Sequence, residues 1–456
     1  MKKRFMTCAS ALIVFKAKLV CVTEFESTAL LTDMYELTML QSALADGTAY
    51  RNCTFEVFSR RLPNERRYGV VAGTARVLEA IKRYRFTEKQ LASLTFLDAT
   101  TIDFLRSYEF KGQIDGYREG ELYFPSSPIL TVRGTFAECV ILETLILSIM
   151  NADSAVASAA ARMVTAADGR PIFEMGSRRT HEYAAVTAAR AAYLAGFVGT
   201  SNLEAVYRYG IPGSGTAAHA WTLLHVNDDG TPNEPAAFQS QINVLGVGTT
   251  LLVDTYDIAK GVKTAIEIAG PQLGAVRIDS GDLGVMTRKV RQELDSLGAH
   301  NTGIVVSSDL DEYAIAGLRG NPVDAFGVGT SVVTGSGAPT AGMVYKLVEV
   351  DGHPVAKRSR GKAMVGGTKR AVRTHRATGT AVEEIVFPYD HDTPQIGQLN
   401  SYELTIPLMR NGIVVDNLPT LEESRAYLAE QLITLPWEGL ALSKDEPVLS
   451  TRFVGF

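Results

Sequence analysis

Cysteine is scarce in this chain. Its 456 residues include four cysteines, Cys8, Cys21, Cys53 and Cys139, and no two of them form a C-x-x-C pair. So few cysteines in a chain of this size argue against a disulfide framework and against a cysteine zinc site, and are typical of a reduced compartment. We therefore expect a cytoplasmic protein.

The chain also lacks a strong excess of charge and a long apolar run. Its formal net charge is −5, so no overall basic field would recruit nucleic acid or acidic lipid. No uninterrupted apolar run reaches the roughly 18 residues of a membrane span. Hydrophobic residues make up 46% of the chain and charged residues 21%, which is typical of a globular protein with a substantial core. We expect neither a nucleic-acid nor a membrane partner.

The first 22 residues stand apart from the rest. They read MKKRFMTCASALIVFKAKLVCV, with a basic start and a short apolar run like those of signal peptides. Lys16 and Lys18 interrupt the run, and no small-residue cleavage site follows it. We treat residues 1–22 as an N-terminal extension and expect the folded protein to begin near Thr23.

Three regions with different patterns follow this extension. Residues 23–150 mix helical and strand patterns and predict an N-terminal α/β domain. In residues 151–346, short apolar runs end in small or polar residues and are followed by helical patterns, at least six times in succession. This alternation predicts a parallel sheet, and six units in a row favour an irregular (β/α) barrel over a doubly wound sheet. Residues 347–456 predict a small C-terminal appendage that begins with a hairpin.

Carboxylates lie at the ends of two of these strand patterns. In RIDSGDLG, Arg277 and Asp279 alternate with apolar residues, so both side chains point to the same side of the strand. Asp254 ends another strand pattern in LLVDTYDI. Such carboxylates suit the hydroxyls of a ribose or Mg²⁺ held through water. An ion pair with aspartate helix caps explains the first pattern equally well, and the sequence leaves both open.

Phosphate-binding features follow other strand patterns. In FGVGTSVVTGSG, the glycines let backbone amides approach a phosphate and the hydroxyls add donors, although no Walker A lysine follows. Arg178 in FEMGSRR offers a fork for phosphate or carboxylate. Tight turns and surface arginines are the alternatives. His219 ends the glycine-rich stretch GSGTAAH, and a lone histidine is more often structural. Together these features predict a phosphorylated sugar substrate.

The motifs taken in order carry a resemblance. LLTDMYELTM, FEMGSRR, GTSN, GSGTAAH, VDTYDI, RIDSGDL and FGVGTS resemble those of bacterial nicotinate phosphoribosyltransferases, from about Thr28 to the GTKRAVR segment. Such enzymes join nicotinate to 5-phosphoribosyl 1-diphosphate, with Mg²⁺, and couple this step to ATP hydrolysis through a phosphohistidine. The resemblance implies an N-terminal α/β domain, an irregular α/β barrel, and a homodimer with shared active sites.

The resemblance also implies a role for single residues. His219 would accept the phosphoryl group of ATP. Tyr35, on the N-terminal helix, would enter the partner's site and stack on the pyridine ring. Arg178 would hold substrate near that ring or near its phosphates. Arg277 would face the nicotinate carboxylate or the diphosphate substrate. Ser201 favours nicotinate, because the related nicotinamide enzyme carries an aspartate in this motif.

The remaining expected roles concern the phosphosugar. Asp279 and Asp254 would take ribose hydroxyls or Mg²⁺, with the metal held chiefly through the diphosphate. The residues expected at the next two strand ends are Ser308, Asp309, Gly327, Gly329 and Thr330, of which the last three would cradle the 5-phosphate.

Two other functions remain open at this point. A quinolinate phosphoribosyltransferase shares the fold type, but it needs more basic residues for two carboxylates and has no phosphorylated histidine. A non-catalytic phosphosugar or nucleotide sensor would keep the phosphate cradle without needing His219.

Overall fold

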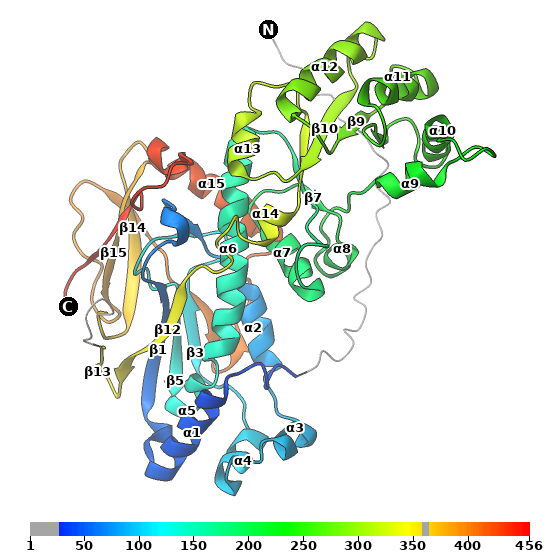
Figure 1. Cartoon of the computed structure of the whole chain (residues 1–456). Helices are drawn as coiled ribbons and strands as arrows, with labels where there is room; N and C mark the ends of the chain where they lie inside the picture. The colour runs from blue at the N-terminus through cyan, green and yellow to red at the C-terminus, as the bar shows by residue number, and fades with distance from the viewer. Residues whose placement is uncertain (1–26, 358–363) are drawn as a thin grey trace.

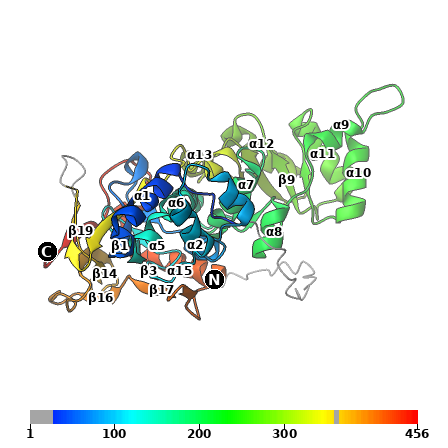
Figure 2. The same ribbon diagram turned by 90° about the horizontal axis from the view of Figure 1, so that it is seen from below.

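The structure is a computed structural model that describes residues 27–357 and 364–456. The N-terminal extension of residues 1–22 lies outside these ranges. Two sheets organise most of the described residues, and Figures 1 and 2 both place them toward opposite ends of the molecule, with the long helix α6 (Glu143–Ala167) between them.

The first sheet has seven strands and is antiparallel throughout, in the order β13-β12-β1-β5-β3-β17-β18. Its core strand β1 is buried at seven of its eight residues, because neighbouring strands flank it on both sides and layers cover both faces. The strands are β1 (Asn52–Ser59), β3 (Gln113–Gly116), β5 (Leu130–Thr135), β12 (Met343–Val350), β13 (His353–Pro354), β17 (Ile406–Arg410) and β18 (Ile413–Val414).

Short helices and a two-stranded ribbon accompany this sheet. Helix α1 begins at Met34 after Asp33 and ends at Gly47, whose φ of 82° suits a glycine. The elements are α1 (Met34–Asp46), α2 (Thr74–Lys82), α3 (Glu88–Ser93), α4 (Ala99–Arg106), α5 (Phe136–Val140), β2 (Gly69–Val70), β4 (Leu122–Tyr123), and the 3-10 turns η1 (Thr48–Tyr50) and η2 (Pro63–Glu65). Helix α1 is the N-terminal helix that was expected to carry Tyr35.

Helix α6 is the core helix of the molecule. Within the described ranges, Phe136–Ala167 is the one helical stretch long and apolar enough to cross a membrane by length and composition. Of its most apolar window, 67% is buried inside the structure, as expected where the alanine-rich face of a helix packs closely against its neighbours. The helix runs through residue 150, where the sequence placed a domain boundary.

The second sheet is parallel and has six strands, in the order β7-β6-β11-β10-β9-β8. Most strands lie beside the strand that follows them in the chain. The exception is β7, which does not pair with β8; these two strands form the edges of the sheet, and β11 pairs with β6. A doubly wound sheet would instead reverse its order at a switch point. The expected irregular barrel is therefore confirmed as a curled sheet that is open between β7 and β8.

The segment that connects the two edge strands supplies no strand to the sheet. Residues 201–249 leave β7, form α8, α9 and α10, and return to β8. The strands are β6 (Ile172–Glu174), β7 (Gly199–Thr200), β8 (Thr250–Leu252), β9 (Ala275–Ile278), β10 (Gly303–Ser308) and β11 (Ala325–Val328). The helices are α7 (Glu182–Leu194), α8 (Leu203–Tyr209), α9 (His219–Leu224), α10 (Glu234–Leu245), α11 (Ile258–Ala269), α12 (Leu283–Ser296), α13 (Glu312–Gly317) and α14 (Thr330–Val333).

The C-terminal residues form a four-stranded sheet in the order β16-β14-β15-β19 and the helix α15. The expected hairpin is β12–β13. The hairpin also pairs with β1, and β17 pairs with β3, so the C-terminal region supplies strands to the first sheet. The elements are β14 (Lys369–His375), β15 (Ala381–Pro388), β16 (Asn400–Glu403), β19 (Ser450–Phe453), α15 (Leu421–Thr434) and η3 (Trp437–Leu440).

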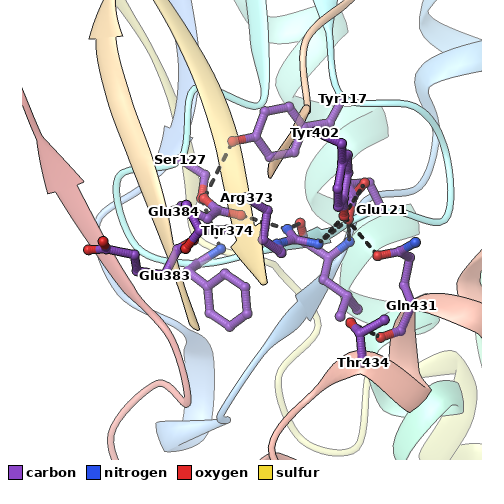
Figure 3. A network of polar contacts seen from close by, with 12 residues as sticks. Tyr117, Glu121, Ser127, Arg373, Thr374, Glu383, Glu384, Tyr402, Gln431 and Thr434 are labelled. Atoms are coloured by element: carbon purple, nitrogen blue, oxygen red, sulfur yellow. Dashed lines mark hydrogen bonds and ion pairs between the residues drawn. The ribbon is translucent and has the colours of Figure 1, made fainter. Parts of the chain in front are cut away.

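A buried polar network joins this C-terminal sheet to the rest of the chain (Figure 3). The guanidinium of Arg373, which is fully buried, forms ion pairs with Glu121 and with Glu384. Tyr402 donates to Gln431 of α15, and Ser127 donates to Glu384. Burial of several charges is tolerated here because each is hydrogen-bonded to a partner.

Candidate active site

A cavity of about 650 Å³ opens at the carboxyl ends of the parallel strands. Active sites of (β/α) barrels form at this end, and small-molecule sites have volumes of roughly 300–1,000 Å³. The lining comes from five strand ends and from the glycine-rich loop before α9. It comprises Met175, Ser177, Arg178, Arg179, Ser201, Ser214, Gly215, Thr216, Ala217, Ala218, Arg277, Asp279, Ser307, Ser308, Asp309, Gly327, Gly329 and Thr330.

Most of the residues that the sequence singled out therefore meet in one cavity. The candidates among its lining are Arg178, Ser201, Arg277, Asp279, Ser308, Asp309, Gly327, Gly329 and Thr330. They meet because parallel strands end at the same edge of a sheet, so residues far apart in the chain become neighbours.

Arg277 and Asp279 leave β9 on the same side, as their alternation predicted. The Nη2 of Arg277 donates to the carbonyl of Ala217 over 3.0 Å, which ties the glycine-rich loop to the strand end. Its Nε is buried without a hydrogen-bond partner. Burial lowers the pKa of Arg277. The nearby carboxylates of Asp279 and Asp254 oppose this effect. A guanidinium with a buried, unused donor is suited to bind an anion.

Asp254 and His219 lie directly beside the cavity. One oxygen of Asp254, Oδ2, accepts from the amide of Asp279 (2.7 Å) and from the hydroxyl of Ser280 (2.8 Å). Its other oxygen, Oδ1, is buried without a hydrogen-bond partner and lies 3.8 Å from Nε2 of His219. Nε2 also lies 4.0 Å from Oδ2 of Asp279, and Nδ1 lies 3.1 Å from the hydroxyl of Thr255. Two carboxylates thus face one edge of the imidazole.

The glycines after β11 allow the backbone to pack closely. A Cβ on Gly327 would lie 2.7 Å from the sulfur of Met175, and one on Gly329 would lie 3.3 Å from the carbonyl oxygen of Met175. The loop is therefore narrow and exposes its backbone and the hydroxyl of Thr330 to the cavity. This arrangement fits the expected phosphate cradle.

Tyr35 does not belong to this cavity. It lies on α1, which Figure 1 shows at the end of the molecule opposite to the parallel sheet, and 46% of it is exposed. Burial, with Glu143 and Glu36 nearby, raises the pKa of its hydroxyl. Any role of Tyr35 in substrate binding would have to be in another subunit.

Comparison with known proteins identifies the family. The model of the nicotinate phosphoribosyltransferase N-terminal domain matches residues 30–151, and the nicotinate phosphoribosyltransferase family model matches residues 171–380. The chain is 60% identical over 428 residues to nicotinate phosphoribosyltransferase pncB1 of Mycobacterium tuberculosis, covering 93% of this chain and 95% of that protein. The chain belongs to the nicotinate phosphoribosyltransferase family.

Solved structures agree with the family in fold. The crystal structure of human nicotinic acid phosphoribosyltransferase has a TM-score of 0.78 at 25% identity, with 92% of this chain and 97% of that chain covered. A nicotinate-nucleotide pyrophosphorylase from Pyrococcus furiosus has a TM-score of 0.75 at 26% identity, with 91% and 99% covered. Both coverages include the N-terminal domain together with the curled parallel sheet.

Three residues that the sequence did not single out support the site of this family member. The hydroxyl of Ser307 donates to Oδ1 of Asp279 over 2.8 Å, and that of Thr255 contacts His219. Glu174, at the end of β6, accepts hydrogen bonds from two neighbouring loops through its buried carboxylate. All three adjoin a recognised motif, but their roles depend on which strands become neighbours.

The residues present fit a shared Mg²⁺ rather than one held by protein alone. Among the described residues, no group of three or more His, Cys, Asp or Glu side chains could hold a metal ion. Asp279 faces the cavity beside the glycine-rich cradle. Mg²⁺ usually takes one or two carboxylates together with the phosphates of a substrate, so Asp279 and a bound diphosphate would form such a site.

Proposed function

We propose that this protein transfers the phosphoribosyl group of 5-phosphoribosyl 1-diphosphate to the ring nitrogen of nicotinate, giving nicotinate mononucleotide and diphosphate, as a step of NAD biosynthesis. The observation that carries the proposal is the cavity itself, which combines a glycine-rich cradle, a carboxylate at Asp279 and the cation Arg277. Membership of the family supports the choice of nicotinate as the acceptor.

The cavity residues suit the chemistry of this transfer. Loss of diphosphate from the anomeric carbon builds positive charge on the ribose, which a nearby carboxylate such as Asp279 stabilises. The guanidinium groups of Arg178, Arg179 and Arg277 would bind the anionic groups of the substrates. Mg²⁺ bound to the diphosphate would neutralise the leaving group. The ring nitrogen of nicotinate carries a free lone pair, so its attack on the ribose needs no general base.

We further propose that ATP hydrolysis is coupled to the transfer through a phosphohistidine at His219. In this step the bond from the γ-phosphorus of ATP to its bridging oxygen breaks, a bond to an imidazole nitrogen forms, and ADP leaves. Water later cleaves the phosphorus–nitrogen bond. The phosphoryl group changes the local charge by about −2, which would alter the affinities of the neighbouring anionic ligands.

The geometry favours Nδ1 of His219 as the acceptor. Asp254 and Asp279 face Nε2, at 3.8 and 4.0 Å, and therefore favour the tautomer with its proton on Nε2. This tautomer leaves a lone pair on Nδ1, beside the hydroxyl of Thr255, which can rotate away. An Nε2–H bond to the unpartnered Oδ1 of Asp254 would need only a small movement of the ring.

The test is incubation with nicotinate, 5-phosphoribosyl 1-diphosphate and Mg²⁺, with and without ATP, and with product measured by mass. His219→Ala should abolish ATP hydrolysis and phosphoprotein formation but leave slow transfer without ATP. A His219→Ala variant that still hydrolyses ATP would exclude His219 as the acceptor. Quinolinate as the preferred acceptor, or ligand binding without product, would support the two rival functions instead.

A homodimer with shared active sites fits the position of Tyr35. The region around it exposes several apolar side chains, namely Leu30, Leu31, Met34, Tyr35 and Met39. Exposed apolar clusters of this kind mark interaction surfaces. We propose that this surface meets the cavity of a second copy in the cytoplasm, which a molar mass near twice 49.3 kDa by light scattering would support.

A further inference from the structure

Glu174 is a buried carboxylate that directly precedes Met175 of the cavity lining. It is the last residue of β6 and is fully buried. Its Oε1 accepts from the amide of Gly176, and its Oε2 accepts from the hydroxyl of Thr200 over 2.5 Å. Burial raises its pKa, and no cation among the described residues offsets that effect. An ion without a counter-ion is costly in this position unless its oxygens are hydrogen-bonded.

The two donors begin two different loops of the cavity. Gly176 precedes Arg178, and Thr200 precedes Ser201, so one carboxylate bridges both. The backbone carbonyl of Glu174 also accepts from the amide of Ser201 over 2.9 Å. The relative position of Arg178 and Ser201 therefore depends on this side chain together with the pairing of β6 and β7.

Thr200 extends the link to the glycine-rich loop. Its amide donates to the carbonyl of Pro212 (3.0 Å), and its carbonyl accepts from the amide of Ser214 (2.8 Å). Its hydroxyl also accepts from the amide of Asn202 over 3.0 Å. A shift of Thr200 would thus be transmitted to the loop that leads to His219.

Gly176 extends the link to the phosphate cradle. A Cβ at Gly176 would lie 2.9 Å from the carbonyl oxygen of Gly329 and 2.2 Å from Cγ1 of Val333. The chain therefore touches α14 and its preceding loop at this point. The hydrogen bond from Gly176 to Glu174 holds the glycine in this close approach.

We propose that Glu174 is a positioning residue that fixes the Arg178 loop, the Ser201 loop and the phosphate cradle relative to one another through its bonds to Gly176 and Thr200. Its side chain does not line the cavity. The proposal rests on the proposed function, because binding of nicotinate and of the phosphosugar is what this alignment would serve.

Kinetics of matched variants test the proposal. Thr200→Val replaces only the hydroxyl by a methyl group, and it should raise the KM for nicotinate by about tenfold while kcat changes less than about threefold. Thr200→Ser keeps the hydroxyl and should restore the wild-type KM. Glu174→Gln should raise the KM for both substrates, because one amide group cannot accept both bonds.

The double variant tests whether the two residues form one link. Glu174→Gln with Thr200→Val should raise the nicotinate KM no further than the larger single effect. The proposal would be overturned if the double variant raised the nicotinate KM by the product of the two single effects. Equal KM values for Thr200→Val and Thr200→Ser would also overturn it. So would a lower melting temperature with unchanged KM. If Glu174→Gln does not fold, the Thr200 pair alone decides.

An assay without turnover separates this proposal from the proposed function. Hydrogen exchange in Thr200→Val should increase at residues 173–179, 199–203 and 211–218 and stay unchanged at residues 303–308. If Thr200→Val changes hydrogen exchange by the same amount in all four segments, or in none of them, the link is rejected even when the enzyme is active. Absence of product from the wild-type protein would instead reject the proposed function. The exchange result would still decide whether Glu174 and Thr200 link the loops.

Discussion

At the scale of single residues, the proposed function predicts that Ser201 sets the charge that a bound pyridine meets. It is exposed in the cavity, on the loop that also holds Asn202. Ser201→Asp should raise the KM for nicotinate at least about tenfold, equivalent to about 1.4 kcal/mol, because a carboxylate repels the carboxylate of nicotinate. Steady-state kinetics with nicotinate measures this.

Ser201→Asn is the matched control for this prediction. Asparagine has nearly the same shape as aspartate and no charge, so its effect on the KM for nicotinate should be clearly smaller. If both substitutions give the same KM, then steric exclusion rather than charge acts at this position.

Glu234, the first residue of α10, predicts a pH dependence of stability. Its Oε1 is buried without a hydrogen-bond partner. Burial, with Asp257 nearby, raises its pKa to about 7 from an ordinary value of 4.5. The folded protein therefore holds this proton more tightly than the unfolded chain does, so the contribution of Glu234 to stability falls as the pH rises from about 4.5 to about 7.

Replacing Glu234 by Gln removes this titration. The melting temperature of Glu234→Gln relative to wild type should increase between pH 5 and pH 8, by about 1–3 °C. Glu430→Gln, at an exposed position of α15, controls for the loss of a charge. A difference between wild type and Glu234→Gln that is constant with pH would contradict the prediction.

The aspartates show how far sequence could assign single residues. Asp257 and Asp282 cap α11 and α12, accepting from the amides of Lys260 (2.8 Å) and Val285 (3.0 Å). Asp279 lines the cavity and Asp254 lies beside it. The sequence left caps and a ligand site open for these aspartates, and alternation placed only Arg277 and Asp279 on one side of a strand. Glu174 could not be identified, because its partner Thr200 becomes a neighbour only through the pairing of β6 with β7.

At the scale of elements, α11 lies unusually close to the strand end that carries Asp254. Gly261 is in the interior of this helix, and a Cβ there would lie 2.4 Å from the carbonyl oxygen of Val253. Alanine normally favours a helix over glycine by about 1 kcal/mol. Gly261→Ala should nevertheless lower the melting temperature and ATP hydrolysis, because the helix must move away from Val253.

Gly317 provides the comparison for this helix. It ends α13, and a Cβ there would meet no atom within 4 Å. Gly317→Ala should therefore leave the melting temperature unchanged or raise it slightly. Equal stability of the two alanine variants would show that α11 does not depend on its close approach to the strand end.

The order of elements was predictable where the signals are local. Strand patterns that end in small or polar residues, followed by helical patterns, located all six parallel strands and favoured a barrel. The opening between β7 and β8 was not predictable, because β7 has two residues and the helices of residues 201–249 resemble any other crossover. Whether such a segment adds a strand depends on tertiary packing.

At the scale of the whole molecule, the pairing of distant segments escaped sequence reasoning. β12 pairs with β1 and β17 pairs with β3, although nearly 300 residues separate each pair by number. Pattern and turn signals describe a strand but not its partner. The division of the chain at residues 150 and 346 therefore stays a prediction, with a first sheet that takes strands from both sides of the barrel.

The Arg373 network predicts where this arrangement is most sensitive. Arg373 is fully buried between Glu121 and Glu384, whose side chains are 1% and 0% exposed (Figure 3). Arg373→Met would leave two buried carboxylates without a cation and should lower the free energy of unfolding by about 3–5 kcal/mol. Urea denaturation followed by fluorescence measures this.

Arg452, on the same sheet, is the control that shows whether burial, and not only the presence of an ion pair, causes the loss of stability. It contacts Glu383 over 2.8 Å, but its side chain is 50% exposed. Arg452→Met should cost less than about 1 kcal/mol, because water screens an exposed pair. Adding Glu121→Gln and Glu384→Gln to Arg373→Met should recover part of the lost stability, since the uncompensated charges then disappear. Equal losses for Arg373→Met and Arg452→Met would mean that the C-terminal sheet is held by its strands and apolar contacts, and that the network adds no stability of its own.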